Sequence, residues 1–175
     1  MEFKELIFER RSTRKYAAPV EREALIEILR NAQMAPSWKN MQTSRCYAVL
    51  DPEKVAALRE TALPAFNQKS STNAALVVTT FVKDTVGFTE GKPDNEVGNG
   101  WGAYDLGLHD AFLVLAARDA GYDTLIMGIR DADAIRAALA IPENEQIMSV
   151  IAIGKREREP GVRPRKELDE VAKII

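Results

Sequence analysis

The chain has 175 residues, of which 46% are hydrophobic and 29% are charged, and its formal net charge is −2. Length and composition are those of a globular domain that buries its own core, so we predict a single domain over residues 1–175. A net charge of −2 excludes a protein whose whole surface binds polyanions, so any anion binding must come from a local group of basic residues. Because the chain has one cysteine, Cys46, and one histidine, His109, we expect neither an internal disulfide nor a metal site.

The sequence gives no sign of export or of a membrane anchor. Residues 1–5 carry charge where a secretory signal peptide needs an apolar run. The longest apolar stretch, residues 74–78, is too short to span a bilayer. These two features predict a cytoplasmic protein without a membrane partner.

Hydrophobic spacing and turn residues predict helices that alternate with strands. In chain order we expect a helix over residues 3–10, a helix over 20–34, a strand over 45–50, a helix over 52–61, a strand over 74–82, a loop over 84–100, a helix over 101–120, a strand over 122–127, a helix over 132–140 and a strand over 147–153. The unbroken strand over 74–82 is typical of burial on both faces. The helix over 101–120 is apolar around most of its circumference, which predicts a place in the core or at a subunit interface.

Two further segments, a long loop and the C-terminal tail, fall outside the predicted alternation of helices and strands. The predicted loop over 84–100 contains four glycines and no helical or strand period, and long loops of this kind often border binding sites. We therefore expect it beside a substrate pocket. The tail from about residue 155 is strongly charged and then ends in spaced apolar residues, which something must cover.

Two polar clusters flank the predicted helix over 20–34. Arg10-Arg11-Ser12-Thr13-Arg14 gathers three guanidinium groups and a hydroxyl, which is a combination that holds phosphate. Because this cluster follows a helix C-terminus, the helix dipole does not favour an anion there and the cations must supply the binding. The second cluster, Ala35 to Gln42, offers a hydroxyl and amides to a polyol or a heterocycle edge. A phosphorylated heterocycle needs both clusters, and flavin mononucleotide (FMN) is the natural candidate.

Together with the segments 66–69, 121–128, 153–155 and 163–166, in this order, the two clusters resemble the flavin-dependent nitroreductase family. The resemblance implies an α+β fold with a mixed, largely antiparallel central sheet flanked by helices. It also implies an enzyme that passes hydride from NADH or NADPH through flavin N5 to an electron-poor small molecule, such as a nitroaromatic or a quinone. The implied assembly is a homodimer in which the tail, about 155–175, reaches over the partner subunit.

The resemblance implies a set of residues that share contact with FMN: Arg10, Arg11, Ser12, Arg14, Pro36, Ser37, Trp38, Asn40, Gln42, Asn67, Lys69, Met127, Gly128, Arg163 and Arg165. No side chain is expected to act as a catalytic acid or base, because the flavin carries the chemistry.

The implied roles differ along the chain. The first arginine and the serine of the first cluster would hold the phosphate, and Arg14 would lie near the pyrimidine edge. The segment 36–40 would reach the flavin of the other subunit. Asn67 would bind the ring, with Lys69 near N1 and O2, and the strand end at 127–128 would face N5. Two basic residues near the C-terminus would also contact the phosphate. They are either Arg163 with Arg165 or Arg165 with Lys166.

Other interpretations remain at this stage. A non-enzymatic flavin-binding protein would share every binding residue, and the same family includes dehalogenases and enone reductases. Arginine-rich segments also bind nucleic acid, but interleaved exposed aromatic residues are lacking, so no nucleic-acid partner is expected. Gly98 to Ala103 fits a dinucleotide-binding pattern without the preceding strand that this pattern requires. Trp38 and Lys39 depart from the family, which commonly has smaller residues at these positions.

Overall fold

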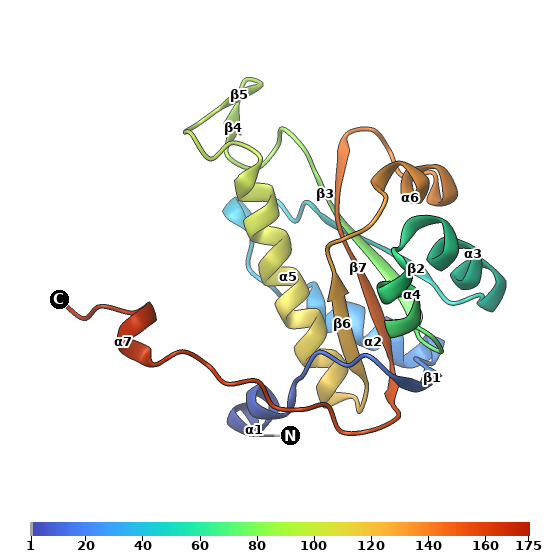
Figure 1. Cartoon of the computed structure of the whole chain (residues 1–175). Helices are drawn as coiled ribbons and strands as arrows, with labels where there is room; N and C mark the ends of the chain where they lie inside the picture. Colours follow the sequence, from blue (N-terminus) through green and yellow to red (C-terminus); the bar gives the residue numbers. More distant parts are fainter. Residues whose placement is uncertain (1) are drawn as a thin grey trace.

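A computed structural model describes residues 2–175 of the chain (Figure 1). Its elements in chain order are α1 (Phe3–Glu9), β1 (Tyr16–Pro19), α2 (Arg22–Ala32), the 3-10 turn η1 (Trp38–Asn40), β2 (Ser44–Val49), α3 (Pro52–Ala62), α4 (Ala65–Ser70), β3 (Ala75–Val82), β4 (Phe88–Thr89), β5 (Lys92–Pro93), α5 (Gly100–Asp119), β6 (Asp123–Met127), α6 (Ala132–Leu139), β7 (Glu145–Arg156) and α7 (Leu168–Val171). All the predicted helices and strands are present, with ends shifted by a few residues.

The centre of the main sheet is β7, which pairs antiparallel with β1, β3 and β6, while β2 pairs antiparallel with β3. Ala152 pairs with Leu76 of β3 and with Leu125 of β6, so these two strands flank β7 on opposite edges. One isolated bridge, between Ser12 and Thr124, is parallel. The predicted α+β fold with a mixed, largely antiparallel sheet is therefore confirmed.

Helices cover both faces of this sheet, and they form two separate hydrophobic clusters with it. On one face, Ile28 of α2 and Leu113 of α5 pack with Val77. On the other face, Leu58 of α3 and Ile135 of α6 belong to the second cluster. Figure 1 shows α5 along one side of the sheet and α3, α4 and α6 along the other. The strand β3, which lies between β7 and β2, is buried over almost its whole length, as its apolar sequence predicted.

Two of the elements that the sequence pattern did not predict, β1 and α4, matter for the site. The short strand β1 forms because it pairs with β7, and a side chain at Gly154 would collide with the carbonyl oxygen of Ala18. Only glycine permits this close approach of two backbones. The second element, α4, has six residues, too few to show a helical period. It buries Asn67 in the segment before β3.

The prediction of an irregular loop over 84–100 is only partly correct. The segment contains the β4–β5 ribbon, and its two ends are joined by a reciprocal pair of hydrogen bonds. The amide of Asp84 donates to Asn99 Oδ1, and Asn99 Nδ2 donates to Asp84 Oδ1, both at 2.8 Å. These contacts link residues far apart in the segment, so a local pattern cannot reveal them. We refer to residues 84–100 as the closed loop.

The longest helix, α5, is not enclosed by this chain on all sides. Tyr104 is 61% exposed and Phe112 is 39% exposed, on the side that faces away from the sheet. After β7 the tail runs away from the body of the molecule and carries α7 with it (Figure 1). The apolar tail residues are exposed, Ile174 to 97%. Within residues 2–175, no helix combines the length and the apolar character that crossing a membrane requires.

Candidate functional site

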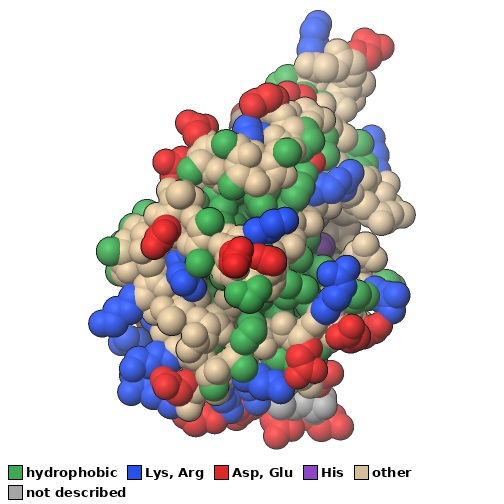
Figure 2. Space-filling view, turned by 90° about the vertical axis from the view of Figure 1, so that its right-hand side faces the viewer, with side chains coloured by type: hydrophobic (Ala, Val, Ile, Leu, Met, Phe, Trp, Pro, Cys, Tyr) green, Lys and Arg blue, Asp and Glu red, His purple; other side chains and the backbone are tan. Residues whose placement is uncertain are grey.

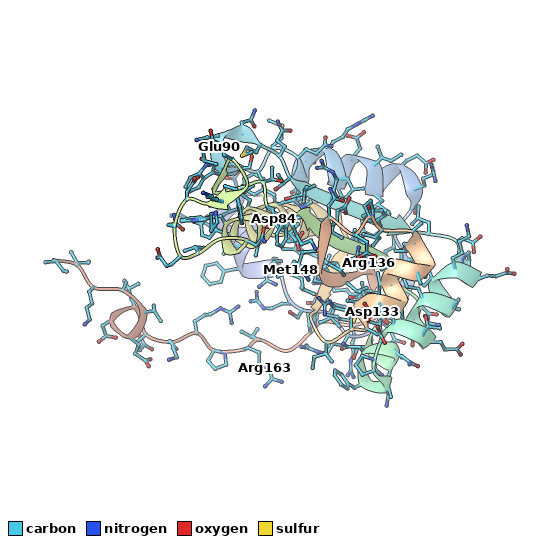
Figure 3. The ribbon with its side chains drawn as sticks, turned by 90° about the horizontal axis from the view of Figure 1, so that it is seen from above. Asp84, Glu90, Asp133, Arg136, Met148 and Arg163 are labelled. Atoms are coloured by element: carbon cyan, nitrogen blue, oxygen red, sulfur yellow. The ribbon has the colours of Figure 1, made fainter. Side chains whose placement is uncertain are left out.

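The two ends of the chain meet in a cavity of about 370 Å³. Five arginines and a serine from the first cluster and the tail contribute to its lining: Arg10, Arg11, Ser12, Arg14, Arg163 and Arg165. Figure 2 shows basic side chains at the lower end of the molecule, mixed with acidic ones, at the level where Figure 1 places α1 and β1. Arg163 stands on the extended ribbon that leaves the body (Figure 3). The structure thus brings the sequence-predicted phosphate residues together.

The charges in this cavity are not balanced by nearby acids. Burial lowers the pKa of Arg10, and the charges of Arg165 and Arg11 lower it further. Within residues 2–175, none of the cavity's guanidinium groups forms an ion pair with a carboxylate. Arg11 donates to the carbonyl of Arg10 at 2.9 Å instead. A bound anion would relieve this repulsion, so the site fits a phosphate.

Backbone contacts fix the arginine cluster against β6. The amide of Thr13 donates to the carbonyl oxygen of Thr124 at 2.9 Å, next to the bridge between Ser12 and Thr124. The hydroxyl of Tyr16 donates to the carbonyl of Thr13 at 2.9 Å. From Thr124 to Gly128, β6 covers roughly 13 Å at about 3.3 Å per residue. One strand therefore connects the anion cavity with the predicted N5-facing strand end.

A buried ion-pair group forms around Asp123, the residue before Thr124 in β6. Asp123 contacts Arg118 at 3.2 Å and Arg156 at 3.8 Å. Burial raises the pKa of Asp123, and the two arginines oppose that rise. Arg156 also pairs with Glu159, at the start of the tail. The group thus ties β6, α5, the end of β7 and the start of the tail together.

The far end of β6 leaves space for a flat ligand. Met127 is buried, whereas Gly128 is exposed, and a Cβ built on Gly128 meets no atom within 4 Å. Asn67 joins this region because its Nδ2 donates to the carbonyl oxygen of Ile129 at 3.0 Å. Lys69 lies two residues further along α4, and residues at this spacing point to different sides of a helix. The structure therefore groups Asn67 with Met127 and Gly128, and leaves Lys69 outside the group.

The second polar cluster folds into a tight turn at η1. Lys39, Asn40 and Gln42 have positive φ angles of 47°, 55° and 50°. Such conformations are costly for residues other than glycine and collect at functional sites. Besides its backbone hydrogen bonds, two bonds to side chains hold the turn: the amide of Gln42 donates to Ser37 Oγ at 3.1 Å, and the amide of Trp38 donates to Asp105 Oδ2 at 2.9 Å.

This turn borders a cavity of its own, of about 360 Å³, which includes Pro36, Ser37 and Gln42 in its lining. It shares no lining residue with the cavity of arginines. Within one chain, therefore, the two polar clusters do not form a single pocket. Asp105 is a site residue that the sequence pattern missed. Local sequence did not single it out, because α5 also buries Asp110 and the hydrogen-bond partner of Asp105, Trp38, lies 67 residues away along the chain.

Cys46 and His109 also line this second cavity. Cys46 Sγ lies 3.9 Å from His109 Nε2, and His109 Nδ1 lies 3.2 Å from Asp110 Oδ1. Burial raises the pKa of the Cys46 thiol to about 12, and the charge of Asp110 adds to the rise. The thiol is therefore protonated near neutral pH, and a protonated thiol is a poor nucleophile.

Comparison with known proteins identifies relatives along almost the whole chain. The model described as "Nitroreductase family" matches residues 7–155. A curated protein of Bacillus subtilis (strain 168), named "Putative NAD(P)H nitroreductase MhqN", is 27% identical, and the match covers 94% of this chain and 93% of that protein.

Solved structures share the fold. A "putative nitroreductase" from Exiguobacterium sibiricum 255-15, solved in complex with FMN, has a TM-score of 0.85 at 23% identity and covers 100% of this chain and 98% of that one. A nitroreductase family protein from Streptococcus pneumoniae TIGR4 has a TM-score of 0.84 at 23% identity, with 99% of this chain and 100% of that chain covered. The chain belongs to the nitroreductase family and is an oxidoreductase of that family.

Proposed function

We propose that this protein is an FMN-dependent oxidoreductase that passes a hydride from NADH or NADPH to an electron-poor small molecule, such as a nitroaromatic or a quinone. The observation that carries the proposal is the cavity of uncompensated arginines beside β6, whose charge suits the phosphate of FMN. Family membership and the FMN in the Exiguobacterium sibiricum protein support the same cofactor. The name of MhqN supports a nicotinamide donor.

Bound FMN would supply the N5 atom for hydride transfer, so that NAD(P)H, a proton and a quinone give NAD(P)⁺ and a hydroquinone. The chain's own residues would bind and orient this group. Arg10 and Ser12 would hold the phosphate, Arg14 would lie at the pyrimidine edge, and Arg163 and Arg165 would close the cavity from the tail. The arginine forks match phosphate oxygens in geometry and in charge.

The ring would lie along β6 toward its far end. The open space at Gly128 admits a flat ring close to the backbone, and Asn67 is already held next to this strand end. A backbone N–H at 127–128 would then face N5. Lys69 would need its long side chain to reach around α4 in order to approach the N1 side of the ring.

We further propose a homodimer in which each flavin contacts both chains. The turn at η1 borders a cavity separate from the arginines of its own chain, so its Ser37 and Asn40 suit a flavin held by a second copy. The outward side of α5 exposes Tyr104 and Phe112, and the tail exposes its apolar residues. A second copy with exchanged tails would remove both surfaces from water, at about 25 cal/mol per Å² of apolar area.

The test is acceptor-dependent oxidation of NADH and NADPH by the purified protein loaded with FMN. We expect turnover with 1,4-benzoquinone and with 4-nitrobenzoate, and none when FMN is removed. A protein that binds FMN but oxidises neither nicotinamide would contradict the proposal and indicate a flavin-binding protein without enzymatic activity. Turnover with an enone or a halogenated phenol alone would assign a different reaction of the same family.

A further inference from the structure

Three aromatic side chains meet where α5 begins. The ring centroids of Trp38 and Trp101 are 4.9 Å apart with an angle of 54° between the ring planes. Tyr104 meets Trp101 edge-on, with centroids 5.9 Å apart and an angle of 73°. These distances and angles are those of favourable aromatic pairs. We call these three residues the aromatic cluster.

The middle ring of the cluster is fixed by the closed loop. Trp101 Nε1 donates to Asn95 Oδ1 at 2.9 Å. Gly87 lies against the same ring, because a Cβ at this position would come within 2.7 Å of Trp101 Cδ1. Trp101 is therefore held by the closed loop on one side and by Trp38 on the other. A ring held in this way is a rigid support for its neighbours.

The outer members of the cluster are also held, yet they remain accessible. The backbone of Trp38 is anchored to the buried carboxylate of Asp105 and enters the left-handed turn at Lys39. Trp38 is half-buried, and Tyr104 is 61% exposed. Lys39, next to Trp38, is exposed. The structure therefore offers a preformed aromatic surface, and an exposed lysine follows Trp38 directly in the sequence.

We propose that Trp38, Trp101 and Tyr104 form the wall against which the ring of the electron acceptor stacks, with Lys39 attracting its negatively polarised oxygen atoms. This inference rests on the proposed function, because it takes Ser37 and Asn40 to reach a partner's flavin. Trp38 lies between these two residues, so the aromatic cluster would border that flavin. The wall selects acceptors with a planar ring, namely quinones and nitroaromatics, over acceptors without a ring.

Two variants of Tyr104 test the selection. Tyr104→Ala removes an exposed ring, whereas Tyr104→Phe keeps it and serves as the matched control. We expect Tyr104→Ala to raise KM for 1,4-naphthoquinone and for 4-nitrobenzoate roughly 2- to 10-fold, the scale of one aromatic contact. Tyr104→Phe should stay within about 2-fold of the parent protein. The rate with ferricyanide, which has no ring to stack, should be the same in all three proteins. Equal changes for ferricyanide and the aromatic acceptors would overturn the inference.

The neighbouring cation has its own test. Lys39→Gln should raise KM for the anionic 4-nitrobenzoate by a larger factor than KM for the neutral 1,4-naphthoquinone, because only the first carries a full charge. If Lys39→Gln raised KM by the same factor for both acceptors, Lys39 would have no role in attracting the acceptor.

A binding measurement keeps the inference testable even if turnover fails. Trp38 and Trp101 are the only two tryptophans of the sequence, so intrinsic emission reports on the aromatic cluster. We titrate the FMN-loaded protein with 4-nitrobenzoate in the absence of nicotinamide. Saturable quenching, with a half-saturation concentration that rises in Tyr104→Ala, supports the wall. Linear quenching without saturation overturns it. Saturable quenching without nicotinamide oxidation would count against the proposed function alone.

Discussion

Arg10 lies close enough to Arg165 for the charge of Arg165 to lower the pKa of Arg10, although the two residues belong to opposite ends of the chain. Folding therefore brings like charges together in a half-buried position, where mutual repulsion opposes folding. An anion bound between them would convert this repulsion into attraction. This relationship is the main physical support for a phosphate site.

The first prediction concerns FMN affinity. Arg10→Ala should weaken FMN binding by about 1.5–3 kcal/mol, the scale of a hydrogen bond to a charged group, as measured by fluorescence titration of the protein freed of flavin. Arg165→Ala should have a similar effect. Unchanged FMN affinity in the double variant Arg10→Ala/Arg165→Ala would remove both residues from the phosphate site.

A second prediction separates the two possible C-terminal pairs. Arg163 lines the cavity of arginines, whereas Lys166 pairs with Glu170 at 3.9 Å and is absent from that lining. Arg163→Ala should therefore weaken FMN binding, and Lys166→Ala should leave it nearly unchanged because an exposed ion pair contributes little. A larger loss of FMN affinity in Lys166→Ala than in Arg163→Ala would instead identify Arg165 and Lys166 as the two C-terminal residues that bind the phosphate.

The third prediction concerns the homodimer. Deletion of residues 167–175 removes α7 and the exposed apolar end of the tail, which we propose to pack on a partner. We expect the deletion to weaken dimerisation and to lower flavin occupancy together, as followed by sedimentation and by visible absorbance. A truncated protein that is monomeric and fully loaded with FMN at micromolar concentration would show that one chain suffices for the site.

The fourth prediction uses two glycines of the closed loop. Gly87 and Gly91 both have positive φ angles, 72° and 75°, but only Gly87 lies against Trp101. Gly91→Ala should cost about 1–2 kcal/mol of unfolding free energy from backbone strain alone. Gly87→Ala should cost more and should change tryptophan emission, because Trp101 must move. Identical effects of the two substitutions would show that the packing of Trp101 on the loop contributes nothing.

The fifth prediction concerns pH. Burial raises the pKa of Cys46 to about 12, whereas an unperturbed thiol has a pKa of about 8.5. At pH 8 the thiolate fraction is then lower by about three orders of magnitude, so iodoacetamide should modify Cys46 at least roughly 100-fold more slowly in the folded protein than in urea. The folded state keeps a proton that the unfolded chain loses, so this group's contribution to stability falls as pH rises from about 8.5 toward 12. Equal alkylation rates would contradict the burial of the thiol.

Local sequence patterns could predict the elements that depend on local spacing. Neighbouring residues in the sequence were enough to recognise three of them: the arginine cluster, the strand over 74–82 and the apolar helix over 101–120. The strand β1 and the meeting of Arg165 with Arg10 depend on pairing between distant segments, which no local pattern contains. The predicted strand over 147–153 is shorter than β7 at both ends, for a related reason. Glu145 is polar but buried, because Tyr47 donates a hydrogen bond to it at 2.9 Å across the sheet.

The candidate site likewise contains residues that local motifs reveal and residues that only the folded chain brings together. The residue types that suit a phosphate and a flavin ring were visible as short motifs, and the resemblance supplied their roles. The aromatic cluster was not predicted, because Trp38 and Trp101 are far apart in sequence and meet only when η1 packs against α5. Asp105, which anchors η1, is likewise recognisable only once its partner is known.

Hydride transfer through the flavin is tested by an anaerobic titration of the FMN-loaded protein with NADH and, separately, with NADPH, followed in the visible flavin band. We expect at least one nicotinamide to bleach the flavin fully, and 1,4-naphthoquinone added afterwards to restore the oxidised spectrum. A flavin that remains oxidised with both nicotinamides, or a bleached flavin that no quinone or nitroaromatic reoxidises, would contradict the proposed oxidoreductase activity.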